Sequence, residues 1–102
     1  MVHIRWIRST YLIQRQGGEE ERTGIISSYF GFGITGDRCR YVITHLPSGL
    51  KLGETRTQRG SKDLCGALLG LPVEWYLIDP FRGIDARTLE QVREAVSAAR
   101  EK

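Results

Sequence analysis

His45 is the first candidate for acid–base chemistry, because histidine titrates near neutral pH. It lies three residues before Ser48, in a Leu-Pro-Ser-Gly turn signal, so the two could form a base and a nucleophile. Serine is also favoured in turns for backbone reasons. We therefore expect His45 to be a structural or partner-contacting residue, and catalysis is the alternative.

Asp79 is the carboxylate best placed for unusual chemistry, because it follows an apolar stretch and precedes Pro80. A partly buried acid there would have a perturbed pKa. Alternatively, Asp79 only caps the turn that follows. The acidic run Glu19–Glu21 is expected in a solvated loop. A small enzyme would have its pocket near His45 or Asp79.

No motif indicates a metal, a cofactor or a covalent mechanism. The sequence lacks the HExxH zinc motif, the GxSxG nucleophile motif and the glycine-rich phosphate loop. Cys39 and Cys65 are too far apart in sequence to form a metal-binding or redox pair. We expect both to be small buried side chains, and we predict no cofactor, no metal and no enzymatic activity.

The Ser28–Thr35 segment combines aromatic side chains with alternating glycines and is flanked by arginines. Such a strand could stack the bases of single-stranded nucleic acid. Alternatively, its aromatics lie in the core of a twisted strand, where glycine allows a close approach to the backbone. The candidate contact residues are Tyr29, Phe30, Phe32, Arg38 and Arg40.

The same segment resembles the Gly-Phe-Gly-Phe strand of cold-shock domains, with Thr23–Ile26 upstream. Phe30, Gly31 and Phe32 also fall in register with the signature of RNA-recognition motifs. Both resemblances imply that these aromatics stack on single-stranded nucleic acid. The basic residue and glycine that open the cold-shock motif are absent, and cold-shock barrels have no pair of C-terminal helices.

Two further surfaces could contact a protein partner. The first is near the N-terminus, where Trp and Arg are typical of interface hot spots and an edge strand could pair with another chain. Alternatively, this is an ordinary edge strand whose Trp packs into the core. The second is the charged Glu54–Lys62 segment, which is otherwise expected to be a mobile connector. The candidate residues are Arg5, Trp6, Arg8 and Tyr11 in the first surface and Arg56 and Arg59 in the second.

The first half of the chain predicts an antiparallel sheet of about four to five strands over residues 2–57. Apolar and polar residues alternate in Val2–Trp6, and Thr23–Tyr29 is rich in β-branched residues. Arg38–Leu46 carries bulky residues on both faces, so we expect it to be a central strand. Pro47 and Gly49 predict a tight turn with a left-handed glycine, after which the chain returns as a strand.

The rest of the chain predicts two helices, about residues 61–71 and 86–100, because apolar residues recur there with helical spacing. Ser61 is expected to cap the first helix, and Asp85 or Thr88 the second. Val73–Asp79 is expected to be a short strand or a buried loop. With both helices on one face of the sheet, the fold is α+β, and the other face is solvated or an interface.

Length and composition are those of one globular domain that spans residues 1–102. The apolar content of 40% and charged content of 26% exclude global disorder. No apolar run approaches the ~20 residues that a membrane span needs. Charged residues between Met1 and Arg8 interrupt any signal-peptide core. We therefore expect a cytoplasmic protein without membrane contact.

The charge is unevenly distributed along the chain. Residues 1–60 carry nine basic and five acidic side chains, and residues 61–102 carry six and seven. The predicted sheet is thus the electropositive part. Twelve of the fifteen basic residues are arginine, whose fork suits carboxylates and phosphates. This favours a partner with an acidic face or a nucleic acid.

We conclude from the sequence that the chain is a small non-enzymatic binding protein, a protein-binding accessory or inhibitor. In size and architecture it is similar to accessory proteins of phages and other mobile elements, anti-CRISPR inhibitors among them. A nucleic-acid-binding protein is the alternative, and a small enzyme is the second alternative. The sequence leaves open whether the chain is a monomer or a homodimer.

Overall fold

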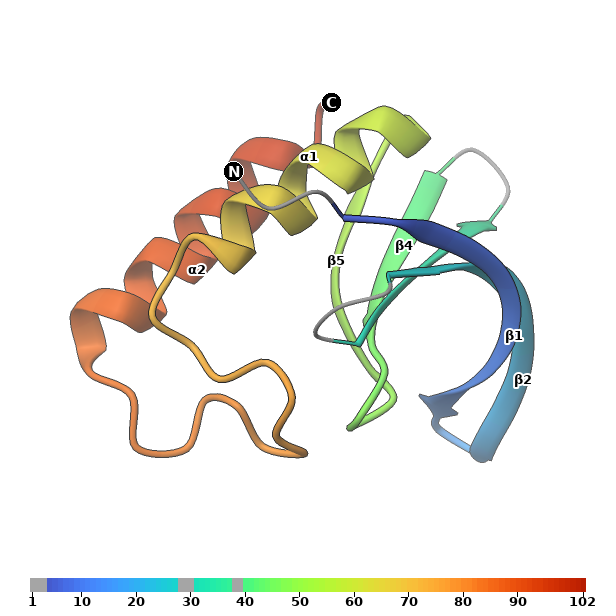
Figure 1. The fold of residues 1–102 in the computed structure, drawn as a ribbon, viewed down its shortest axis with the longest axis horizontal. Coiled ribbons are helices and arrows are strands. Elements are labelled where there is room, and N and C mark those ends of the chain that lie inside the picture. The colour runs from blue at the N-terminus through green and yellow to red at the C-terminus, as the bar shows by residue number, and fades with distance from the viewer. Residues whose placement is uncertain (1–3, 28–30, 38–39) are drawn as a thin grey trace.

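A computed structural model describes residues 4–27, 31–37 and 40–102. They form a five-stranded antiparallel sheet and two helices, which confirms the α+β prediction (Figure 1). Each strand pairs with the next along the chain. The elements are β1 (Trp6–Arg15), β2 (Gly18–Ser27), β3 (Phe32–Asp37), β4 (Arg40–His45), β5 (Leu50–Thr55), α1 (Gln58–Leu69) and α2 (Ala86–Ala99).

β1 and β2 form a long hairpin that turns at Gln16 and Gly17; Gly18, where β2 begins, has a φ of 124° that favours glycine. Glu19–Glu21 belong to β2 and pair with Leu12–Gln14, so the predicted loop is wrong. Charged residues fit this strand because pairing uses the backbone while their side chains stay exposed. Glu20 also forms ion pairs, including one of 2.9 Å with Arg15.

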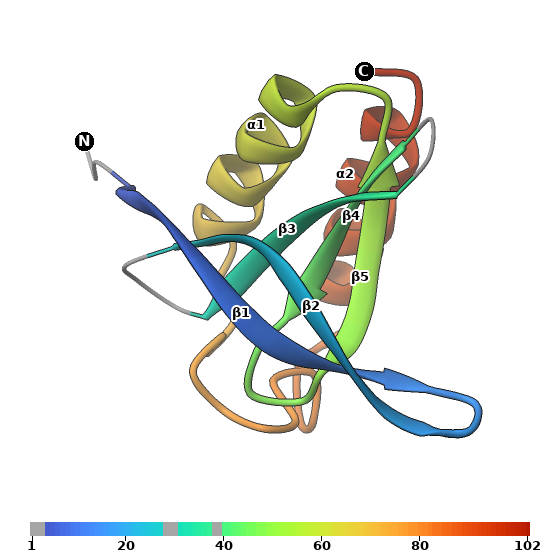
Figure 2. The same ribbon diagram turned by 90° about the vertical axis from the view of Figure 1, so that its right-hand side faces the viewer.

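The β1–β2 hairpin curves over the face of the sheet that the helices leave uncovered (Figures 1 and 2). The Tyr11 ring lies on Gly33, where an added Cβ would be 2.7 Å from Tyr11 Cζ. The Tyr11 hydroxyl also shares a hydrogen bond with Thr35 Oγ1. The glycine therefore allows a close approach, and the chain itself covers part of the second face.

The turn between β4 and β5 confirms the prediction for residues 46–49. Gly49 has a φ of 73°, and its amide donates to the His45 carbonyl over 2.7 Å. A register shift between Ile43 and Thr44 marks an irregularity in the pairing. β5 is the last strand in the sheet order, and among the described residues no strand pairs along its outer edge; β1 reaches only its start, where the Gln14 amide donates to the Gly49 carbonyl at 2.8 Å.

The two helices lie side by side on one face of the sheet, as predicted (Figure 1). Their predicted ranges shift only slightly, to 58–69 and 86–99. Buried members of the core between helices and sheet include Phe32, Ile43, Leu68 and Trp75. Within the described ranges, no helix has the length and apolar character that crossing a membrane requires.

The capping residues explain where the two helices begin. Thr57 caps α1, because its Oγ1 accepts from the Gly60 amide at 3.0 Å. The prediction that Ser61 caps this helix is wrong: Ser61 lies within it, and its hydroxyl is 2.5 Å from Thr55 Oγ1. Asp85 caps α2 as predicted, and its Oδ1 accepts from the amide three residues later at 2.7 Å.

Candidate functional site

Residues 70–85 join α1 to α2 through turns and contain neither helix nor strand. Trp75 is only 1% exposed, whereas Tyr76, Leu77 and Ile78 are 62%, 39% and 74% exposed. The expectation of a short strand or a buried loop for Val73–Asp79 is therefore wrong. One side chain anchors the loop, and the three that follow it face solvent.

Trp75 holds this loop against both layers of the fold. Its indole Nε1 donates to the Leu68 carbonyl in α1 at 3.0 Å. The ring packs edge-to-face on Phe32 in β3 and on Phe81, with centroids 5.3 and 5.5 Å apart. The position of the exposed residues after Trp75 is thus set by the core.

His45 fixes the backbone of the same residue. Its Nε2 is 2.6 Å from the Trp75 carbonyl, and its Nδ1 is 2.7 Å from Ser48 Oγ. A carbonyl only accepts, so Nε2 donates and Nδ1 accepts from the Ser48 hydroxyl. Because His45 is 1% exposed and both ring nitrogens are engaged, its contacts are structural, and it is not accessible to contact a partner directly, the other role that the sequence allowed.

Two adjacent hollows, of about 450 and 490 Å³, lie along β5, and we call them together the β5 groove. They share Lys51, Leu52 and Phe81. The first continues along α2, and the second continues towards the β4–β5 turn and the 70–85 loop. Apolar lining residues include Leu50, Leu52, Ile78, Pro80, Phe81 and Val96.

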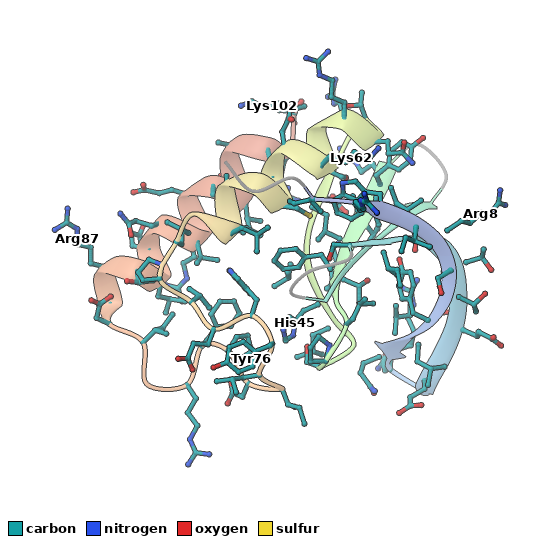
Figure 3. All side chains as sticks on the ribbon, in the orientation of Figure 1. Arg8, His45, Lys62, Tyr76, Arg87 and Lys102 are labelled. Atoms are coloured by element: carbon teal, nitrogen blue, oxygen red, sulfur yellow. The ribbon has the colours of Figure 1, made fainter. Side chains whose placement is uncertain are left out.

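Exposed apolar side chains gather beside this groove. Among the described residues six large apolar side chains are exposed, and four of them are Leu50, Tyr76, Leu77 and Ile78. Leu50 and Ile78 line the groove. In Figure 3 the labelled Tyr76 and His45 both lie in the lower middle of the view. Leu50 and Ile78 therefore extend the hollow into exposed apolar surface, and Tyr76 and Leu77 lie next to Ile78 in the loop.

Positive charge surrounds the other end of the groove. The Glu54 carboxylate is 3.0 Å from Lys51 Nζ, 3.6 Å from Arg40 and 3.7 Å from Arg100. The hydrogen bond from Lys51, followed by these charges, holds the pKa of Glu54 below its usual range. Arg93 lines the groove without an ion-pair partner in the part of the chain described. One carboxylate thus faces several cations.

The structure does not bring the residues predicted near the N-terminus into one site. Trp6 is half-buried against the core and Tyr11 is buried, whereas Arg5 and Arg8 are exposed. Trp6 thus packs against the core, as the alternative interpretation of its strand predicted. The two aromatics are five residues apart in an unbroken register, so they lie on opposite faces of β1, with Trp6 against the core and Tyr11 against Gly33.

The charged segment before α1 is not a mobile connector, because it forms the end of β5 and the first turn of α1. Arg56 pairs with Glu101 over 2.6 Å, and Arg59 is exposed in α1. Arg40 lies at Glu54, far along the sheet from the exposed apolar loop. These arginines therefore do not form one patch with the β1 residues.

Phe32 is fully buried, which places it in the core and out of reach of a nucleic acid base. This was the alternative that the sequence left open for its segment. Tyr29, Phe30 and Arg38 lie outside the described residues, and so does Cys39. Phe32 therefore does not belong to an exposed face on which bases could stack.

Two other expectations concern single groups. Cys65 is buried as predicted, and burial raises the pKa of its thiol to about 12. Asp79 is exposed and lines the β5 groove, so it is not a partly buried acid, which was one of the two possibilities that the sequence left open. Across the described ranges no three acidic, histidine or cysteine side chains are arranged to hold a metal ion.

Sequence reasoning missed the β5 groove and its loop. The available signal was the run Trp75–Ile78, which is apolar without a period of either helix or strand. Such a run between two turn signals fits neither a strand nor a helix face.

Comparison with protein-family models, curated proteins and solved structures finds no match to this chain.

Proposed function

We propose that the chain is a non-enzymatic protein-binding module whose contact surface is the β5 groove with Tyr76–Ile78. The observation that carries this proposal is that Leu50 and Ile78, two of the six exposed large apolar side chains among the described residues, line one hollow, and two more, Tyr76 and Leu77, directly precede Ile78 in the chain. Contiguous exposed apolar surface is typical of interaction sites, whereas scattered apolar residues are not.

The anchoring of the loop supports the same function. A contact loop that is ordered before binding loses less conformational entropy when the partner binds. Here Trp75 is held by α1, β3 and His45, so its exposed neighbours start from a defined position. A cytoplasmic accessory or inhibitor role, as in phage and mobile-element proteins, belongs to this proposal on size and architecture alone.

The test is capture of a partner from native-host extract by the immobilised chain, compared between two variants. Ile78→Glu places a charge in the proposed contact surface and should abolish capture. Leu12→Glu is the matched control, because Leu12 is similarly exposed at 52% but lies on the β1–β2 hairpin. It should leave capture unchanged.

The proposal fails if both variants retain the partner or if both lose it while remaining folded by circular dichroism. Analytical ultracentrifugation of the pure chain covers the case of a homodimer. If the chain dimerises and Ile78→Glu makes it monomeric, the surface is self-complementary and the external partner is excluded.

Nucleic-acid binding remains the first alternative function, and the cations at Lys51, Arg93 and Arg100 are the observation that favours it. Their charges would contact phosphates rather than stack bases. Gel shifts at low salt test this alternative, because phosphate contacts are strongest there. Retardation that is lost in Arg93→Glu would favour nucleic acid over a protein partner.

A small hydrolase is the second alternative, because Ser48 Oγ lies 2.7 Å from His45 Nδ1 beside the 490 Å³ hollow. This distance fits a nucleophile and its base. The same hydroxyl accepts from the Leu50 amide at 3.2 Å, as expected of a serine that shapes a turn. Labelling by a fluorophosphonate probe that is lost in Ser48→Ala would support catalysis.

A further inference from the structure

The outer edge of β5 indicates which kind of protein segment the groove would bind. This inference rests on the proposed protein-binding function. We propose that the β5 groove binds an extended acidic peptide segment of a partner protein. The peptide adds a strand beside β5, with apolar side chains in the two hollows and acidic side chains at the surrounding cations.

The first argument is the backbone of β5. A strand at the edge of a sheet presents amide and carbonyl groups that an added peptide can bind. α2 lies behind β5 rather than beside its outer edge (Figure 2). It approaches the strand at Gly53, where an added Cβ would be 2.9 Å from Val96 Cγ1. The helix thus forms the back wall of the groove.

The second argument is the spacing of the hollows. They overlap at Lys51 and Leu52, and one reaches Leu50 while the other reaches Glu54. Side chains two residues apart on a strand project from the same face about 7 Å apart. A strand added beside β5 would therefore direct alternate side chains into neighbouring hollows. Because the lining is largely apolar, those side chains should be apolar.

The third argument is charge. Lys51 pairs across from Thr44, whereas Leu52 packs on the core beneath the helices, so the two side chains lie on opposite faces of β5. The peptide residues between the apolar ones would face Lys51. Arg93 and Arg100 surround the end of the groove near α2. Acidic side chains complement these cations, of which Lys51 and Arg100 share Glu54 as their carboxylate and Arg93 does not.

The test is selection from a random-peptide phage library on the immobilised full chain. Enriched peptides should alternate apolar residues with aspartate or glutamate. A fluorescein-labelled synthetic copy of the most enriched peptide then serves as the probe in anisotropy titrations. N-methylation of its alternate amides should abolish binding, because strand addition needs those hydrogen bonds.

Charge variants test the second part of the proposal. Lys51→Gln and Arg93→Gln should each weaken binding of the probe by about two- to fivefold, the effect expected for one exposed charge pair. Glu54→Gln should strengthen it by a similar factor, because the cations lose their competing carboxylate. Arg87→Gln, in an exposed position of α2 outside the groove, is the control and should change nothing.

No enriched sequence, enrichment of basic peptides, or binding that tolerates N-methylation would overturn the strand-addition proposal. If a captured partner depends on Ile78 but the probe does not compete with it, strand addition fails while the protein-binding function stands. If Ile78→Glu has no effect on a captured partner, the proposed function itself fails. Probe binding with the predicted variant effects, together with competition, supports both.

Discussion

The imidazole Nε2 of His45 donates a hydrogen bond of 2.6 Å to the carbonyl of Trp75. This bond joins β4 to a loop that lies thirty residues further along the chain. Since Trp75 is followed directly by the exposed residues Tyr76–Ile78, the bond connects the core to the proposed contact surface. The site therefore depends on a buried polar contact that is itself out of reach of a partner.

Replacing His45 with leucine should destabilise the protein and loosen the 70–85 loop. The buried Trp75 carbonyl would lose its donor, which costs about 1–3 kcal/mol of unfolding free energy. Urea denaturation measures that loss, and faster tryptic cleavage after Arg82 reports the loosened loop. Ser48→Ala keeps the Nε2 bond and should cost less. Equal losses in the two variants would contradict this role of His45.

Alkaline pH should destabilise the protein through Cys65. Burial raises the pKa of this thiol from its ordinary 9.0 to about 12, so between these values the unfolded chain releases a proton that the native chain retains. The free energy of unfolding should therefore fall by about 1.4 kcal/mol per pH unit in that window. Burial also raises the pKa of Tyr11 above its ordinary 10.0, so this hydroxyl adds to the loss of unfolding free energy above pH 10.

The variant Cys65→Ala isolates the contribution of the thiol. Its unfolding free energy, measured by urea denaturation across the alkaline range, should decline less steeply than that of the parent. The slope is the readout, because the substitution itself also changes core packing. A slope identical to the parent's would show that Cys65 does not titrate differently in the two states.

Two glycine substitutions should change stability in opposite directions. Gly53→Ala puts a Cβ 2.9 Å from Val96 Cγ1, and displacing α2 from β5 should cost about 1–3 kcal/mol. Gly66 is exposed on α1, and a Cβ added there meets no atom within 4 Å, so Gly66→Ala should raise the unfolding free energy by up to about 1 kcal/mol through helix propensity. Thermal melting compares the two. A stabilising Gly53→Ala would contradict the close packing of α2 on β5.

The elements were predictable where the signal is local. Pro47 and Gly49 define the β4–β5 turn through backbone preferences, and Asp85 caps α2 through its own side chain. Ser61 shows the limit of such reasoning, because Thr57 is an equally good cap four residues earlier. The choice between them depends on Thr55, which takes up the Ser61 hydroxyl inside the fold.

The candidate site was not predictable, because it depends on contacts between distant segments. Whether Trp75 or Tyr76 is buried depends on which of them reaches His45 and Leu68. The β5 groove likewise combines a strand, a loop and α2, and neither Leu52 nor Val96 signals it alone. The aromatic segment at Phe32 gave a stronger local signal, yet it lies in the core.

The most direct test of the proposed contact surface is an NMR titration of the ¹⁵N-labelled chain with its captured partner. Amide signals of Leu50–Glu54 and Tyr76–Phe81 should shift or broaden, and those of the β1–β2 hairpin should stay in place. Shifts confined to the hairpin, with β5 and the loop unchanged, would contradict the assignment of the β5 groove as the binding site.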